Sequence, residues 1–208
     1  MTLTKALIIF ANWSFQDTAA LEAKVKQHYG EDGGDAEDSG VKGFMDLSTF
    51  LNKAQSECLN EDDEHPYGHC LTGGGGYLQS DCDEQLILAL SFNQAVKIHS
   101  MKIKAPGDKG PKNVRIFMNQ PTTLDFDKAD SMAAAQDLSL TPEQLDGSVI
   151  PLKYVKFQNV QNIQLFFKDN QGGGEVTQID HFSVIGTPLQ TTNMSEFKRV
   201  AGKKGERE

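Results

Sequence analysis

Three cysteines are the side chains of this sequence best suited to covalent chemistry, and they lie at positions 58, 70 and 82. Thiol redox proteins usually place two cysteines two residues apart, so that one attacks and the other resolves. No Cys-x-x-Cys motif occurs here, and free cysteines commonly serve as small buried apolar side chains. The odd number also argues against a disulfide scaffold and for a reducing compartment. A residual thiol redox function of Cys58, Cys70 or Cys82 is therefore a secondary prediction.

The segment His65-Pro-Tyr-Gly-His69-Cys70 follows a run of carboxylates at positions 61–64. Imidazole, thiolate and carboxylate groups are the ligands that zinc prefers. However, the spacing matches no zinc finger or ribbon, in which ligands occur as closely spaced pairs. We predict a polar surface loop here, with no metal site and no cofactor.

Two further segments have compositions found in binding loops. The four glycines at 73–76 lack the following Lys-Ser/Thr or helix that a phosphate-binding loop needs, and favour a flexible loop. Residues 80–84 hold three carboxylates, but the alternating oxygen ligands and glycine turn of a calcium loop are incomplete. We predict edge protection or an acidic patch that faces a partner. No Gly-x-Ser-x-Gly frame occurs and the five histidines are scattered, so we expect no catalytic residues.

The length of 208 residues fits one core with additional terminal segments. A formal net charge of -9 disfavours nucleic acid as a partner, because a polyanion is repelled by such a chain. No apolar stretch reaches the length that spans a membrane, so no membrane partner is expected. The free chain is expected to be a monomer. We divide the chain into an unrelated leader (1–16), a helix (17–29), an acidic glycine-rich linker (30–40), a β domain (41–190) and a basic mobile tail (191–208).

Alternating apolar residues predict strands in the central part of the chain. The alternating sets are Leu86, Leu88, Leu90 and Phe92; Val114, Ile116 and Met118; Val155 and Phe157; and Ile163, Leu165 and Phe167. A further alternation changes parity between Ile98 and Met101, which predicts a β-bulge near His99 and Ser100. The glycine-rich segment 169–175 predicts a hairpin loop between strands at 163–168 and 177–185.

The stretches in which apolar residues recur at helical spacing are short. Apolar residues at 44, 47, 50 and 51 predict a short helix against the core, and residues 132–138 have a helical pattern expected in a connecting loop. At least six strands with so few helices favour an antiparallel sandwich or barrel.

Several motifs together form a distinctive set. They include Gly110-Pro-Lys-Asn-Val-Arg-Ile-Phe117 and Leu78-Gln-Ser-Asp-Cys82-Asp-Glu-Gln-Leu86, and continue at 54–61, 151–160, 185–188, 193–200 and 202–206. This set resembles the PITH domain, the C-terminal half of the thioredoxin-like protein 1 family. The resemblance covers roughly Val41 to Glu206. It implies an all-β, jelly-roll-like antiparallel β-sandwich of the galactose-binding-like kind, with a short N-terminal helix and a disordered tail. It also implies docking on the regulatory particle of the 26S proteasome, in cytoplasm and nucleus.

One departure from the family pattern limits what the resemblance implies. Full-length members place a thioredoxin domain with a Cys-Gly-Pro-Cys site ahead of this module, and here only Thr18 to His28 resembles the last helix of that domain. The sequence is expected to be a shortened form, such as an alternative-start or spliced product or an incomplete gene model. The reductase activity of full-length family members is therefore not expected of this sequence.

The leading functional prediction is a non-catalytic adaptor. Its basic tail suits an acidic groove on a partner, and the tail residues predicted to bind are Phe197, Lys198, Arg199, Lys203 and Lys204. A carbohydrate-binding module is the least favoured alternative, because the β domain has three tyrosines and no tryptophan for stacking on a sugar.

Overall fold

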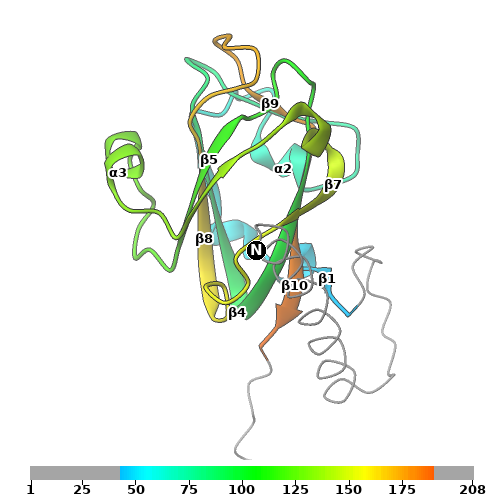
Figure 1. Ribbon diagram of the computed structural model, residues 1–208, viewed down its shortest axis with the longest axis vertical. Coiled ribbons are helices and arrows are strands. Elements are labelled where there is room, and N and C mark those ends of the chain that lie inside the picture. Colours follow the sequence, from blue (N-terminus) through cyan, green and yellow to red (C-terminus); the bar gives the residue numbers. More distant parts are fainter. Residues whose placement is uncertain (1–42, 190–208) are drawn as a thin grey trace, which may run out of the picture.

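One long strand, β4, runs from Leu86 to Lys104 and holds the fold together (Figure 1). The computed structural model describes residues 43–189, and there the chain forms a curled, eight-stranded antiparallel sheet. The first half of β4 pairs with β2 and β8, and the second half pairs with β7 and β10. Strands average about 5–6 residues, so the 19 residues of β4 are enough to serve both halves of the sheet.

The remaining elements are short. The strands are β1 (Met45–Asp46), β2 (Glu57–Leu59), β3 (Leu78–Gln79), β5 (Asn113–Met118), β6 (Gln136–Ser139), β7 (Asp146–Pro151), β8 (Val160–Phe167), β9 (Gln178–Ile179) and β10 (His181–Pro188). The helices are η1 (Ser48–Phe50), η2 (Lys53–Gln55), α2 (Tyr67–Cys70), α3 (Phe126–Ser131) and η3 (Pro142–Leu145). The strand order is β1-β10-β4-β8-β5-β6, with β2 and β7 also on β4 and with β3 and β9 as a separate pair.

A β-bulge divides the second half of β4. Ser100 pairs with Ile185 and Ile98 pairs with Gly186, which leaves His99 as an extra residue on β4. Because one extra residue reverses the alternation, Ile98 and Met101 both face the core although their parity differs. The bulge predicted near His99 and Ser100 is confirmed.

The core lies between the two halves of the curled sheet. Its largest fully buried side chains include Phe157, Phe167 and Phe182, and each such side chain contributes roughly 1.5–3 kcal/mol by burial. A smaller cluster of Ile87, Phe117, Leu124, Ala129 and Phe166 lies under α3. The all-β sandwich expected from the alternation is confirmed.

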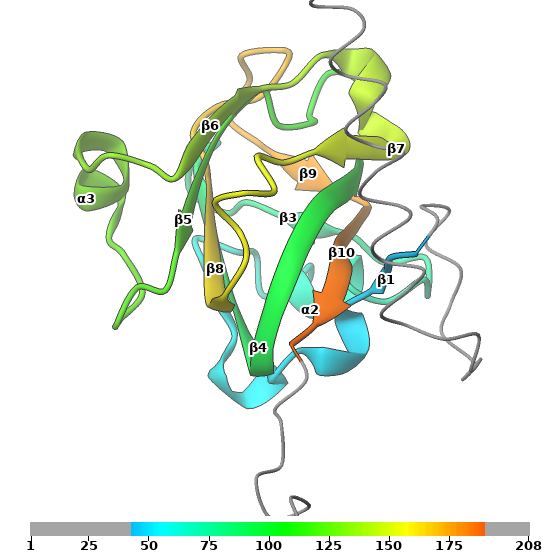
Figure 2. The same ribbon diagram turned by 60° about the horizontal axis from the view of Figure 1, so that its bottom comes forward.

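One predicted connection and one predicted helix are wrong. β8 and β10 do not form a hairpin, because they pair with β4 from opposite sides (Figure 2). The loop between them instead leads into β9, which pairs with β3. The predicted helix at 44–51 begins as the two-residue strand β1 on β10 and continues only as the 3-10 turn η1.

Two predicted elements lie elsewhere. Val155 and Phe157 belong to a turn, in which the Lys156 amide donates to the Lys153 carbonyl, so Phe157 is buried while Val155 is 88% exposed. The helical pattern at 132–138 is also misplaced. The helix forms earlier, at α3, because the Asp125 side chain accepts from the Lys128 amide and caps it, while Gln136–Ser139 pairs with β5 as β6.

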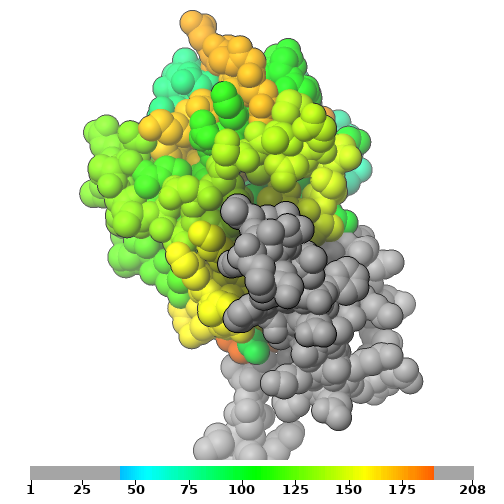
Figure 3. Space-filling model, viewed as in Figure 1, coloured from blue at the N-terminus to red at the C-terminus, as the bar shows by residue number. Residues whose placement is uncertain are grey.

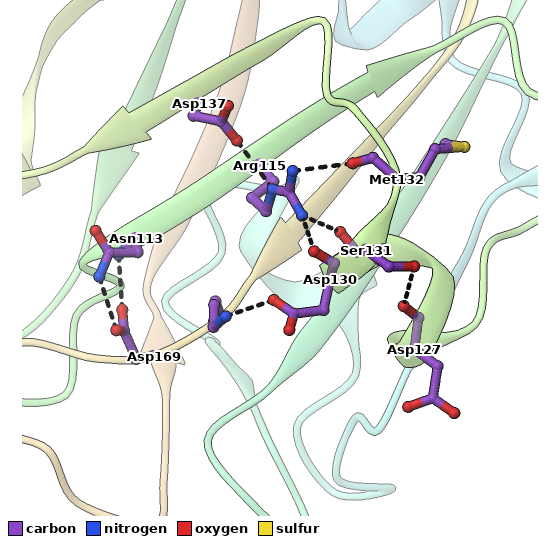
Figure 4. Close-up of polar contacts among 10 residues, drawn as sticks. Asn113, Arg115, Asp127, Asp130, Ser131, Met132, Asp137 and Asp169 are labelled. Atoms are coloured by element: carbon purple, nitrogen blue, oxygen red, sulfur yellow. Dashed lines mark hydrogen bonds and ion pairs between the residues drawn. The ribbon is translucent and has the colours of Figure 1, made fainter.

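Arg115 on β5 joins α3 and β6 to the sheet (Figure 4). Its Nη1 donates to the Ala129 carbonyl at 2.8 Å and to the Asp130 carbonyl, and its Nη2 donates to the Met132 carbonyl at 2.9 Å. Its Nε bonds Asp137 at 2.9 Å. The carbonyls at the end of a helix lack partners within the helix, so this guanidinium caps α3.

Replacing Arg115 by alanine should lower the free energy of unfolding by about 2–3 kcal/mol, because several charge-assisted hydrogen bonds are lost at a side chain only 19% exposed. Urea denaturation measures this change. Lys128→Ala is the matched control, because its ion pair with Asp125 is exposed to solvent and should contribute little to stability. An equal decrease of the free energy of unfolding in the two variants would contradict the role of Arg115 in capping α3.

Gly186, beside the bulge, allows close approach of β10 to β4. A Cβ atom there would lie 2.0 Å from the Lys97 carbonyl oxygen and 3.0 Å from Leu47 Cδ1. We expect Gly186→Ala to lower the free energy of unfolding by about 1–3 kcal/mol through overpacking. Gly174→Ala, where a Cβ meets nothing within 4 Å, should change it by less than about 0.5 kcal/mol in the same urea titration.

Candidate functional site

The three cysteines are free thiols in different environments. Cys58 on β2 is half-buried, and desolvation, helped by the negative charge of Glu61, raises the pKa of its thiol well above the ordinary value. Burial raises the pKa of Cys70 to about 12. The pKa of the exposed Cys82 is also raised, because its Sγ donates to Asp81 Oδ2 at 3.2 Å. All three shifts disfavour the thiolate, which is the reactive form.

The segment weighed as a zinc site uses its polar side chains to hold its own loop. Glu61 Oε2 accepts from the Tyr67 amide at 2.5 Å. The ring of His65 stacks on Tyr77 with centroids 4.1 Å apart, and its Nε2 lies 3.0 Å from the Tyr77 hydroxyl. Between residues 43 and 189, no group of three or more His, Cys, Asp or Glu is arranged to hold a metal ion.

The acidic segment 80–84 also makes structural hydrogen bonds. Ser80 is buried, and its Oγ accepts from the Thr177 amide at 2.9 Å. Asp83 Oδ1 accepts from Asn60 Nδ2 at 2.8 Å, and Asn60 itself adopts a positive φ of 65°. Asp81 and Asp83 remain exposed, so the segment keeps an acidic surface.

Three of the four glycines, Gly73, Gly75 and Gly76, line a surface pocket of about 580 Å³ together with Lys104, Asp180 and His181. Gly76 approaches His69 so closely that a Cβ there would lie 2.9 Å from its ring. The pocket therefore has both a cationic and an anionic side chain on its wall, and it opens at the end of β4.

An aromatic cluster lies on the outer face of the sheet at the His99 bulge. Phe44 stacks on the His99 ring with centroids 4.2 Å apart and planes 27° apart. Tyr154 lies 5.9 Å from His99 and 6.1 Å from Phe44. All three side chains are half-buried, and desolvation lowers the pKa of His99 so that the imidazole is neutral at neutral pH. Three segments remote in sequence meet here.

Three lysines of β4 lie on the same outer face, and we call Lys97, Lys102 and Lys104 the lysine strip. The first two are half-buried and Lys104 is exposed, and none forms an ion pair with any residue from 43 to 189. Lys102 lies opposite Val149, which is 39% exposed, and Val155 is 88% exposed in the segment after β7. Figure 3 shows that segment, in yellow, on the visible face.

Lysines, half-buried aromatic rings and exposed apolar side chains thus lie together on this outer face, and of these the aromatic side chains are the kind enriched at protein interfaces. Sequence reasoning missed it, although the lysines occupy the outward positions between the buried residues of β4. The residues predicted to bind a partner, Phe197, Lys198, Arg199, Lys203 and Lys204, lie outside the described residues. So do the predicted leader, helix, acidic linker and tail. No helix among residues 43–189 is long and apolar enough to cross a membrane.

A comparison with protein-family models matches residues 37–202 to the PITH domain. Thioredoxin-like protein 1 of Schizosaccharomyces pombe is 34% identical over 166 residues, covering 77% of this chain and 57% of that protein. A PITH domain-containing protein of the same yeast is 31% identical over 114 residues, covering 53% of this chain and 54% of that protein. The chain thus spans little more than half the length of these two relatives.

Solved structures with the same fold are galactose-binding-like β-sandwiches. The family 32 carbohydrate-binding module of Clostridium perfringens NanJ, solved with galactose, has a TM-score of 0.52 and 11% identity, covering 68% of this chain and 98% of that chain. Two such modules of Clostridium perfringens ZmpB give a TM-score of 0.55 at 11% identity, covering 76% of this chain and 41% of that chain. At these identities the likeness shows the fold alone, and it agrees with the predicted sandwich.

The thiol environments predict that one cysteine of the native chain reacts readily with a disulfide reagent at about pH 8. That residue is the exposed Cys82, because Cys58 and Cys70 are shielded and hold their protons. Asp81→Asn should speed this reaction by lowering the pKa of Cys82, and Cys82→Ser should abolish the fast phase in a spectrophotometric thiol assay. Equally fast reaction of all three thiols in the native state would contradict this prediction.

Proposed function

This chain belongs to the PITH domain family, and from that premise we propose that its β-sandwich is a non-catalytic protein-binding module that docks on the regulatory particle of the 26S proteasome. The observation that carries the proposal is the family match over residues 37–202, which includes the whole sheet. The proposal places the chain in the cytoplasm and nucleus, as a monomer that uses no cofactor and binds neither nucleic acid nor membrane.

The outer face of β4 supports a protein-binding role. Its half-buried aromatics Phe44 and Tyr154 are already ordered by their contacts with His99, so a partner that covers them does not have to immobilise them. The lysine strip would steer an acidic partner surface toward the same face. The basic tail named above would add a second electrostatic contact under the same proposal.

The alternative thiol redox function is disfavoured by the thiol environments. A catalytic thiol needs a lowered pKa, whereas Cys58, Cys70 and Cys82 all have raised ones. The carbohydrate-binding alternative rests on fold likeness alone. Among residues 43–189, the exposed large apolar side chains are Val149 and Val155, so this part of the surface offers no exposed aromatic platform for a sugar.

The proposal predicts that the purified chain co-sediments with intact 26S proteasomes on a gradient. Binding should be stronger at about 50 mM salt than at about 300 mM, because ionic strength screens contacts between exposed charges. A chain ending at Thr192, which lacks the basic tail, should bind more weakly at the lower salt.

A matched control keeps the tail and replaces Lys109 and Lys112, two exposed lysines outside the lysine strip, by glutamine. This control should co-sediment like the unaltered chain. Absence of co-sedimentation at both salt concentrations would reject proteasome docking, and unchanged binding of the shortened chain would remove the tail from the proposal.

A further inference from the structure

The lysine strip is positively charged, whereas the molecule as a whole carries a negative net charge. Residues 43–189 contain 19 Asp and Glu against 11 Lys and Arg. Lys97, Lys102 and Lys104 nevertheless follow one another along one strand without an acidic partner among the described residues. Asp146 lies opposite Lys104 and Asp180 lines the same pocket, but Asp146 accepts from the Ser148 amide and Asp180 from Gln178, and neither forms an ion pair with Lys104. The strip therefore has no ion-pair partner within the described part of the chain.

The sequence supplies the missing charge just before the described chain begins. Five acids, namely Glu31, Asp32, Asp35, Glu37 and Asp38, lie between Gly30 and Gly40, and no Lys or Arg interrupts them. Polar, glycine-rich segments of this kind cannot bury a core of their own, but they pair readily with an opposite charge. We call residues 31–38 the acidic segment.

The described chain starts on the same face as the strip. Phe44 stacks on His99, the bulged residue of β4 that lies between Lys97 and Lys102. Immediately before it, Gly43 has a φ of 83° in a turn, a conformation that glycine adopts without strain. The backbone therefore does not approach Phe44 as a straight extension of β1, and a turn at this point permits the preceding residues to lie over the sheet.

The dimensions of the two segments agree. From Asp38 to Phe44 the chain spans at most about 20 Å when extended. Lys97 to Lys104 covers about 23 Å at the rise of a β-strand, and an extended acidic segment of eight residues has about the same length. Every lysine of the strip is therefore within reach of an acid of this segment.

We propose that the acidic segment docks on the lysine strip of the same chain and covers it. Because the two are joined by a few residues, the segment acts at an effective concentration in the millimolar range, and weak ion pairs are then enough for substantial occupancy. An acidic partner must displace the segment before it can contact the strip. The inference goes beyond the proposed function, and its test requires no proteasome.

The experiment compares the full chain with a variant that has the acidic segment neutralised by Glu31→Gln, Asp32→Asn, Asp35→Asn, Glu37→Gln and Asp38→Asn. Both are treated briefly with an amine-reactive ester, and the labelling of each lysine is measured by peptide mass spectrometry. Labelling of the lysine strip should rise about threefold in the variant, as expected when an intramolecular contact is released. Labelling of Lys109 and Lys112 should not change.

The matched control neutralises three exposed acids elsewhere on the surface, by Asp63→Asn, Glu64→Gln and Glu175→Gln. It should leave labelling of the strip as in the unaltered chain, and about 1 M salt should remove the difference between the unaltered chain and the acidic-segment variant. Equal labelling of the strip with and without the five acids, or an equal rise in the control, would overturn the contact. Protection that grows with protein concentration would assign the strip to the acidic segment of a second copy and would also overturn the proposal.

Discussion

The backbone hydrogen bonds of β4 connect nearly every part of this domain, because its two halves pair with four other strands. β2 and β8 flank the first half, while β7 and β10 flank the second. A strand with neighbours on both sides along most of its length has few free backbone groups and faces a core that both halves share. The short strands β1 and β2 depend on it, since a strand of two or three residues has too few hydrogen bonds to form alone.

The bulge in β4 links the core to the outer face. One extra residue at His99 lets Ile98 and Met101 both enter the core, and it directs the His99 ring outward to Phe44 and Tyr154. Bulges commonly re-aim side chains next to functional surfaces. The same backbone irregularity thus serves packing on one side of the sheet and builds the aromatic cluster on the other, where the lysine strip also lies.

Burial explains why two of the three cysteines, Cys58 and Cys70, are poorly suited to covalent chemistry in this fold. Cys70 is fully buried and packs in the main core, and the same loss of water that makes this packing favourable raises its pKa to about 12. Cys58 lies beside it with the negative charge of Glu61 nearby. Cys82 stays exposed, and there the hydrogen bond to Asp81, rather than burial, raises the pKa of its thiol.

The sequence by itself determined the fold class and much of the main strand pattern. Alternation identified β5, β8 and both halves of β4, and the change of parity located the bulge, because these signals depend only on which side of a strand each residue faces. The family could likewise be predicted from local motifs. Pairing could not, since the glycine-rich loop after β8 is compatible with a hairpin, and only the sheet shows that β8 and β10 lie on opposite sides of β4. Only the tertiary structure decided the outer face, for the same reason. Phe44, His99 and Tyr154 come from three distant segments of the chain. Long-range strand pairing brings them together, and no local sequence pattern encodes that pairing.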